Sequence, residues 1–402
     1  MLTLDPIQTL AAGGLCLLAG YAIRRRLPLL ARFNIPASVI GGLIVALALL
    51  ACRHWEYVPV QFDASLAKPL MIAFFASIGF NASINLLRIS GPQVVLLLAL
   101  ATFLAIVQNL VGIGVAKAFG LHPLFGVAAG SATLAGGPAT GLAFAPLMEK
   151  AGLAGAASIA LASAMAGIVL GSILGAPLAT MLIERYKLVR GSSGGDAPLA
   201  QTAPATAMVE AVSDAERFQR TLKHIVLLLL AMSVGAWVSE GVRALGVTLP
   251  SYTGAMLVGA LIRNLDDKFG CFRLSMPSIE SIGGICLSFF ISVALMDLHL
   301  WELAGMATPL LVDLALQTLI VAAFCCWPLL RLMGRDYDAA VITGGFAGFM
   351  LGITANAMAV MDSLVERFGA APRAFLVAPL VGAFLIDFTN AIVITFFING
   401  CK

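Results

Sequence analysis

The chain has 402 residues, of which 60% are hydrophobic and only 11% are charged. A soluble globular protein carries about 25% charged residues, so this composition excludes a soluble domain. The formal net charge is +3 and the basic residues are scattered, which argues against a nucleic-acid partner.

Apolar windows between charges and prolines predict five membrane spans in the first half of the chain. Each crossing needs about 20 apolar residues, and the windows lie near residues 7–29, 36–52, 68–87, 92–119 and 153–183. The stretch 123–148 is left over. It is rich in small residues and has Gly136, Gly137, Pro138 and Gly141 at its centre, so a re-entrant loop is favoured over a continuous helix.

The second half follows the same plan after a polar linker. Residues 186–220 contain glycines, prolines and charges without a long apolar window, which is typical of a linker. Five further spans are predicted near 221–245, 250–265, 279–296, 307–332 and 374–399, with a second Gly-rich re-entrant loop near 339–361. The chain therefore divides into an N-terminal repeat (1–185), the linker, and a C-terminal repeat (221–402).

Matching residues support an internal repeat. Pro36 recurs as Pro250, Gly120 as Gly334 and Thr140 as Thr354, each pair 214 residues apart. Five spans per half is an odd number, so the second half must enter the membrane upside down. The predicted fold is an all-α polytopic membrane protein with two inverted repeats of five transmembrane helices, each with a re-entrant loop.

The distribution of basic residues predicts the orientation. With both termini outside and the linker in the cytoplasm, 18 of the 24 Lys and Arg residues face the cytoplasm, as positively charged loops prefer. The six on the other side are Arg53, Lys68, Lys117, Lys150, Arg243 and Lys402.

Broken segments in matching positions of two inverted halves are typical of secondary transporters. Such segments are tolerated at membrane depth only where they line a cavity or are buried in protein. The first reads SATLAGGPATG from Ser131 to Gly141. Its backbone N–H groups at Gly136 and Gly137 can approach an anionic ligand, and Ser131, Thr133 and Thr140 add hydroxyls.

The second broken segment reads TGGFAGFMLGITAN from Thr343 to Asn356. Gly344 and Gly345 provide flexible backbone, while Thr343, Thr354 and Asn356 provide oxygens that suit a hard cation such as Na⁺. The alternative is that both segments only allow helices to pack closely. We assign that packing role to three glycines spaced by four on one predicted helix: Gly167, Gly171 and Gly175.

Polar residues deep in spans are functional candidates by default. Asp387 lies near the middle of the last span with Asn390 close by, and we predict both as Na⁺ ligands together with Thr354; the alternative is a structural carboxylate satisfied by neighbouring hydroxyls. Asp313 lies a turn or two inside its span, from where it could reach the interface. Three further polar residues suit helix-to-helix hydrogen bonds at least as well as substrate contact: Gln108, Asn109 and Gln317.

The sequence contains no G-x-x-x-x-G-K-[ST] loop, G-x-S-x-G elbow or H-E-x-x-H helix, which argues against direct ATP coupling and against an enzyme. The four histidines show no ligand spacing. We therefore expect no cofactor and no metal other than Na⁺ as the coupling ion.

Five stretches resemble the bacterial sodium/glutamate symporters. They are IPASVIGGLIVALALL (35–50), KPLMIAFFASIGFNASI (68–84), VQNLVGIG (107–114), GRDYDAAV (334–341) and FLVAPLVGAFLIDFTNAIVI (375–394). The resemblance covers both halves and most spans, and only the linker shows no resemblance to this family. It implies a homodimer in the cytoplasmic membrane, Na⁺-coupled uptake of glutamate, and an elevator-like movement of a substrate-carrying core against a dimerising scaffold.

Both predicted re-entrant loops contain residues that differ from those common in the sodium/glutamate symporters. Pro138 and Ala139 follow the two glycines where relatives typically read GGHG. In the second loop, Phe346 stands where a His is common, Met350 where a Gly is common, and Ala355-Asn356 where Pro-Thr is common.

These observations predict a Na⁺-coupled symporter for L-glutamate, a small anionic substrate. One alternative keeps the fold but carries another small amino acid or carboxylate, as the changed loops allow. Another is an ion channel or a non-transporting membrane scaffold, against which the paired broken segments argue.

Overall fold

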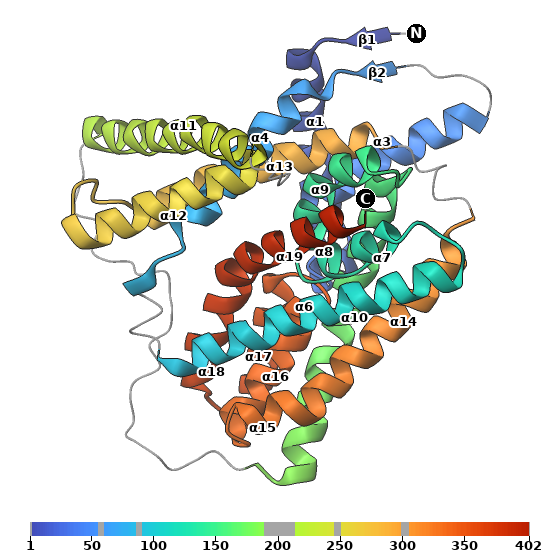
Figure 1. Ribbon diagram of the computed structural model, residues 1–402, viewed down its shortest axis with the longest axis vertical. Helices are drawn as coiled ribbons and strands as arrows, with labels where there is room; N and C mark the ends of the chain where they lie inside the picture. Colours follow the sequence, from blue (N-terminus) through green and yellow to red (C-terminus); the bar gives the residue numbers. More distant parts are fainter. Residues whose placement is uncertain are drawn as a thin grey trace.

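The structure is a computed structural model that describes residues 2–54, 60–85, 91–188, 214–244, 251–298 and 305–401. This part of the chain is almost entirely helical (Figure 1). Its two strands, β1 (Leu2–Leu4) and β2 (Val60–Phe62), pair in parallel near the N-terminus. The all-helical prediction is therefore confirmed, apart from this short pair.

The first half forms a helix at each of its five apolar windows and shorter helices between them. They are α1 (Pro6–Arg26), α2 (Pro28–Arg32), α3 (Ala37–His54), η1 (Ala64–Leu66), α4 (Ala67–Phe80), α6 (Pro92–Ala118), α7 (Leu124–Ala129), α8 (Ser131–Leu134), α9 (Gly137–Lys150) and α10 (Ala156–Tyr186). Asp5 begins α1 with a capping box, because its side chain accepts from the Gln8 N–H and Gln8 accepts in return from the Asp5 N–H.

The second half begins earlier than the sequence predicts. Its helices are α11 (Asp214–Ala244), α12 (Ser251–Phe269), α13 (Met276–Met296), α14 (Ala307–Phe324), α15 (Leu330–Leu332), α16 (Tyr337–Met350), α17 (Thr354–Phe368), α18 (Pro372–Leu380) and α19 (Ile386–Gly400). Residues 214–220, expected in the linker, are helical because they hold good helix formers and no Pro or Gly. Residues 189–213 of the predicted linker lie outside the described residues. One of the four histidines, His299, also lies outside them.

Two spans are interrupted by π turns that involve prolines. The η3 segment (Cys325–Leu329) contains Pro328, and η4 (Val381–Leu385) follows Pro379. Because proline lacks the N–H of the regular ladder, the helix widens there instead of ending.

Seven helices of the described residues are long and apolar enough to cross a membrane: Pro6–Arg26, Pro92–Ala118, Ala156–Tyr186, Phe218–Val242, Met276–Met296, Ala307–Leu332 and Pro372–Gly400. The other three predicted spans are present as α3, α4 and α12, which are shorter or end in charged residues. The chain is thus a polytopic membrane protein.

The span expected to reach residue 87 ends at Phe80, because α12 caps α4. Asn264 donates from Nδ2 to the Ala82 carbonyl (2.8 Å) and accepts the Ile84 N–H at Oδ1 (2.8 Å). These contacts satisfy backbone groups that the helix would otherwise have used.

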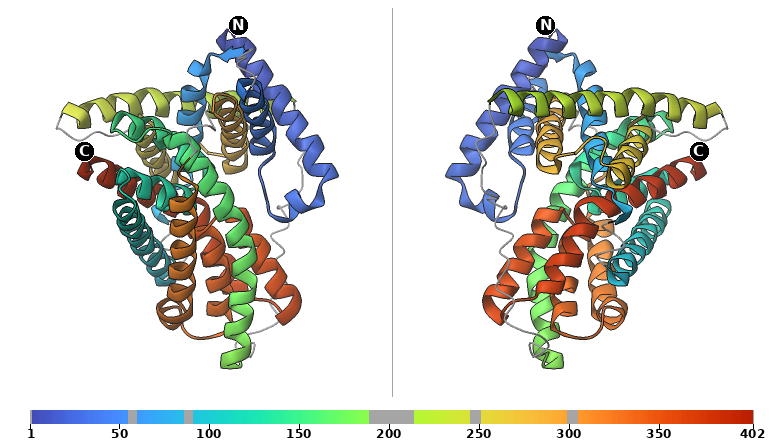
Figure 2. Two further views of the ribbon diagram at one scale, coloured as in Figure 1. Left: turned by 90° about the vertical axis from the view of Figure 1, so that its right-hand side faces the viewer. Right: turned by 90° about the vertical axis from the view of Figure 1, so that its left-hand side faces the viewer.

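The helices form two bundles, each drawn from both halves. The six-helix bundle comprises α1, α3, α4, α11, α12 and α13, and the broken-helix bundle comprises α6 to α10 and α14 to α19. Figures 1 and 2 show the former at one end of the molecule and α14 to α17 toward the other. Few contacts join the bundles, mainly between α9 and α13 and between α4 and α19.

Close approach of α4 and α12 holds the six-helix bundle together across the two halves. A Cβ at Gly79 would lie 2.1 Å from the Met256 carbonyl oxygen, so only glycine fits there. In a membrane, such van der Waals contact between small residues drives helix association.

Asp266 closes α12 by holding the following turn. Its Oδ1 accepts the N–H groups of Phe272 (2.6 Å) and Arg273 (2.9 Å), and its Oδ2 accepts that of Leu274 (2.9 Å). Burial disfavours the charged form, but these three donors outweigh it and lower the pKa of Asp266.

We expect Asp266→Asn to destabilise the protein by about 1–3 kcal/mol, because the new amide nitrogen faces a backbone N–H. The parent should also lose stability as pH falls below about 4, through the depressed folded pKa, since the contribution requires the charged form. Thermal unfolding in detergent at pH 7 and at about pH 3 measures both effects. Glu240→Gln, an exposed change in α11, is the control; equal unfolding temperatures for Asp266→Asn and the parent would contradict the assignment.

Candidate functional site

The broken-helix bundle contains two interruptions at the places where the sequence predicted loops. The first break (residues 135 and 136) separates α8 from α9, which begins at Gly137, and the second (residues 351–353) separates α16 from α17. Gly137 has a φ of +68°, a left-handed conformation that glycine adopts without strain. Pro138 follows in the first turn of α9, where its missing N–H costs nothing.

The two breaks lie against each other, although they belong to different halves of the chain. A Cβ at Gly137 would lie 3.0 Å from Ile353 Cγ2 and 3.9 Å from the Gly352 carbonyl oxygen. Both α9 and α17 therefore begin at one place, and neither has a side-chain cap on its N-terminus.

Amide side chains from neighbouring helices hold the first broken segment. Asn109 on α6 accepts the Ser131 N–H at Oδ1 (3.0 Å), and Asn390 on α19 donates from Nδ2 to the Ser131 carbonyl (2.8 Å). Ser131 opens α8, so its N–H lacks the partner it would have in a continuous helix, whereas its carbonyl already accepts the N–H groups of Ala135 (3.3 Å) and Gly136 (3.1 Å). Asn109 supplies the missing acceptor, and Asn390 adds a further donor to the carbonyl.

A second set of polar side chains holds the other segment. Gln108 on α6 donates to the Met350 carbonyl at the end of α16 (2.9 Å), and Asn356 on α17 donates to the Ile168 carbonyl on α10 (2.8 Å). The Thr354 hydroxyl donates to the Gly382 carbonyl within η4 (2.6 Å).

Several polar atoms around the breaks have no hydrogen-bond partner although they are buried. They are Gln108 Oε1, Asn109 Nδ2, Ser131 Oγ, Asn356 Oδ1 and Asn390 Oδ1. Buried polar atoms normally have partners, and each exception needs an explanation. Most of these atoms can accept, so the group suits a cation or a ligand with N–H or O–H donors.

Asp387 lies in the first turn of α19, directly after the η4 π turn. It is partly exposed, and no hydrogen bond or ion pair to it occurs among the residues whose side chains are described. Asn390 follows three residues later on the same helix face. Between them, Thr389 pairs with the Thr102 hydroxyl of α6 (2.9 Å).

The other predicted site residues have partners within the protein. Thr133 and Thr140 lie close to the first break but make local contacts, and the other three predicted residues lie farther from the breaks. The Thr133 hydroxyl donates to the Ala128 carbonyl (2.8 Å), and that of Thr343 donates to the Ala339 carbonyl of its own helix (2.7 Å). Gly344 faces Ala179 of α10 and Gly345 faces Met361 of α17, so both lie in helix contacts. Thr140 is buried beside Gly136.

The packing role assigned to glycines of α10 is confirmed. A Cβ at Gly167, Gly171 or Gly175 would lie 2.3, 3.0 or 2.8 Å from the carbonyl oxygens of Leu351, Gly348 and Gly344, respectively. This face lets α10 lie directly on α16.

The expectation that Asp313 reaches the interface is wrong. Its side chain is fully buried, because α14 packs against α6 and α10 at this level and Gln317 donates to its Oδ1 (3.3 Å). The sequence also gave no signal for Ser163 of α10, whose hydroxyl donates to the Ala129 carbonyl (2.9 Å) and lies 3.1 Å from the Thr133 hydroxyl.

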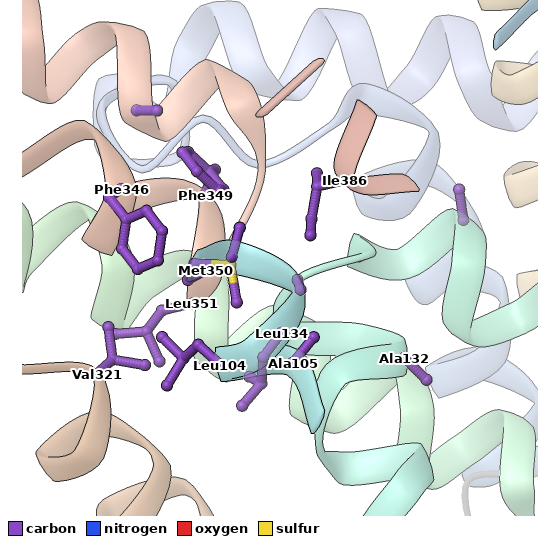
Figure 3. Close-up of a cluster of buried hydrophobic side chains, with 14 of the residues drawn as sticks. Leu104, Ala105, Ala132, Leu134, Val321, Phe346, Phe349, Met350, Leu351 and Ile386 are labelled. Carbon is purple, nitrogen blue, oxygen red and sulfur yellow. The ribbon is translucent and has the colours of Figure 1, made fainter. Parts of the chain in front are cut away.

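The unusual residues of the second loop form an apolar core. Phe346 stacks on Phe324 of α14 (5.9 Å between ring centroids) and meets Phe349 edge-on (5.1 Å). Figure 3 shows Met350 beside Leu134 and Leu104, between the two broken segments. Met350 is fully buried, so it fills space that a glycine would leave open.

Comparison with known proteins is consistent with this geometry. The sequence profile of the sodium/glutamate symporter family matches residues 2–370. The sodium/glutamate symporters of Escherichia coli (strain K12) and Shigella flexneri are each 39% identical over 99% of this chain and 98% of their own. That of Haemophilus influenzae is 37% identical over 97% of this chain and 96% of its own. The chain belongs to the sodium/glutamate symporter family.

Proposed function

We propose that the protein is a secondary active transporter that couples entry of Na⁺ to uptake of L-glutamate across the bacterial inner membrane. Family membership supports the transported species. The observation that carries the proposal is the meeting of the two breaks, one from each half, beside buried polar atoms that lack partners. This is where transporters with broken helices bind substrate and ions.

The substrate carboxylates bind at the breaks. The N-termini of α9 and α17 carry partial positive charge and uncapped N–H groups, which favour anions. Gly136 and Gly137 lie at the first break, Asn356 lies in the first turn of α17, and Ser131 begins α8. The other residues of the predicted set support the two broken segments: Thr133, Thr140, Thr343, Gly344 and Gly345.

Na⁺ binds where η4 meets α19. Asp387 supplies the charge, Asn390 supplies an unpartnered Oδ1, and Thr354 lies against the same turn through its bond to Gly382. Carboxylate, amide and hydroxyl oxygens suit a hard cation.

We also propose two inverted repeats, 1–185 and 221–402, joined by a cytoplasmic linker and placing both termini outside. The stretches 123–148 and 339–361 are re-entrant. Transport is elevator-like, with the broken-helix bundle moving against the six-helix bundle, which forms a homodimer. The interleaving of both halves in each bundle and the few contacts between bundles support this division.

A second candidate substrate class is another small amino acid or carboxylate. The observation that favours it is Met350, whose buried side chain occupies space between the breaks. An ion channel, the other alternative, would conduct ions without saturation and would not accumulate glutamate against a gradient.

Proteoliposomes of the purified protein should accumulate labelled L-glutamate when Na⁺ is high outside, with saturation, because binding at the breaks precedes movement. The measurement is initial uptake with an inward Na⁺ gradient, with K⁺ replacing Na⁺ as the control. Competition by unlabelled amino acids and dicarboxylates identifies the preferred substrate. Folded protein that gives no Na⁺-dependent glutamate uptake would refute glutamate as the substrate.

Asp387→Asn should raise the Na⁺ concentration for half-maximal uptake by about tenfold or more, since a cation ligand loses its charge with little change in shape. The matched control is Glu280→Gln, which removes an exposed carboxylate from α13. Unchanged Na⁺ activation in Asp387→Asn would remove this residue from the site.

Gly137→Ala should reduce the uptake rate by about tenfold, because a Cβ at positive φ costs about 1–2 kcal/mol and would press on Ile353 at the second break. Gly284→Ala is the control, since a Cβ there meets nothing within 4 Å. Equal uptake rates for both variants and the parent would show that the breaks need not meet as described.

A further inference from the structure

A second buried polar cluster lies between α6 and α14, apart from the proposed Asp387 site. It consists of Asp313, Gln317 and Gln108, whose side chains are all fully buried. Asp313 and Gln317 are four residues apart on α14, so they share a helix face. The transport mechanism proposed above uses neither Asp313 nor Gln317.

Hydrogen bonds connect the cluster in one chain. Gln317 Nε2 donates to Asp313 Oδ1 (3.3 Å) and to the Gln108 carbonyl (2.8 Å). Gln108 Nε2 donates in turn to the Met350 carbonyl (2.9 Å), one residue before the second break. The amide nitrogen of Gln317 therefore has two acceptors, and that of Gln108 donates to the end of α16.

Three buried oxygens of the cluster remain without a donor: Asp313 Oδ2, Gln317 Oε1 and Gln108 Oε1. No ion pair to Asp313 occurs in the described residues. The helices packed against α14 are α6, α7, α10 and α16, and their charged or titratable residues lie near their ends: Lys117, Glu184, Arg185, Tyr186, Tyr337 and Asp338, with Cys325 and Cys326 following α14 itself. The carboxyl thus lacks a protein partner that would balance its charge.

The chemistry of the three oxygens selects their partner. A water molecule could donate to two of them but would leave a buried negative charge, which is costly. A proton would remove the charge but supply a single donor for the remaining acceptors. A monovalent cation balances the charge and coordinates several oxygens at once.

We propose that Asp313, Gln317 and Gln108 form a second Na⁺ site between α6 and α14. Gln108 ties this site to the second break through the Met350 carbonyl, so an ion held there fixes the end of α16. That the ion is Na⁺ rests on the proposed Na⁺-coupled transport, whereas the existence of a cation site can be tested without transport.

The experiment is ²²Na⁺ binding to the purified, detergent-solubilised full chain, without glutamate. Asp313→Asn should weaken one class of Na⁺ sites by about tenfold or more and lower the bound Na⁺ per chain by one. Asp387→Asn should leave that class intact, and Glu280→Gln should behave as the parent. Asp313→Leu is the second variant, because an apolar replacement of an unpaired buried charge is expected to fold.

Unchanged ²²Na⁺ binding in both folded Asp313 variants would overturn the proposal. So would a change confined to the pH dependence of uptake, since it would make Asp313 a proton site. Uptake separates this inference from the proposed function. If the parent shows Na⁺-driven glutamate uptake and both Asp313 variants keep its Na⁺ dependence, only the second site is refuted. If the parent transports no glutamate but both variants lose ²²Na⁺ binding, only glutamate as the substrate is refuted.

Discussion

The structure depends on satisfying backbone groups where helices are broken inside an apolar bundle. Lipid offers no hydrogen bonds, so each freed N–H or carbonyl must find a partner within the protein. Ser131 shows the solution for a freed N–H, because Asn109 of α6 accepts it. Its carbonyl already accepts the Ala135 and Gly136 N–H groups and also accepts from Asn390 of α19. The polar residues of α6 and α19 therefore stabilise the first broken segment, whatever they bind.

Small residues decide how closely the supporting helices approach. Gly167, Gly171 and Gly175 let α10 lie on the carbonyls of α16, and this closeness lets Asn356 reach the Ile168 carbonyl. Larger residues on this face would separate the helices and leave that amide without its acceptor. Packing and polar satisfaction are thus one constraint in this bundle.

Much of this arrangement could be predicted from the sequence. The helices follow from apolar windows, and the breaks follow from Gly136, Gly137 and Pro138, whose backbone preferences are local. Depth within a bundle is not local, so Asp313 was expected near the interface and is instead buried. For the same reason the sequence did not show that Thr343 bonds to its own helix, since that depends on its rotamer.

Adjacent residues of α6 connect the two breaks. Asn109 holds Ser131 of the first segment while Gln108 holds the Met350 carbonyl of the second. One turn of α6 is therefore hydrogen-bonded to broken segments of both halves, so any shift of α6 must change hydrogen bonds at both breaks together. Because Gln317 bonds to the Gln108 carbonyl, α14 enters the same network. An ion at the site proposed on α14 would therefore be connected to both broken segments through hydrogen bonds between buried groups, which a low local dielectric strengthens.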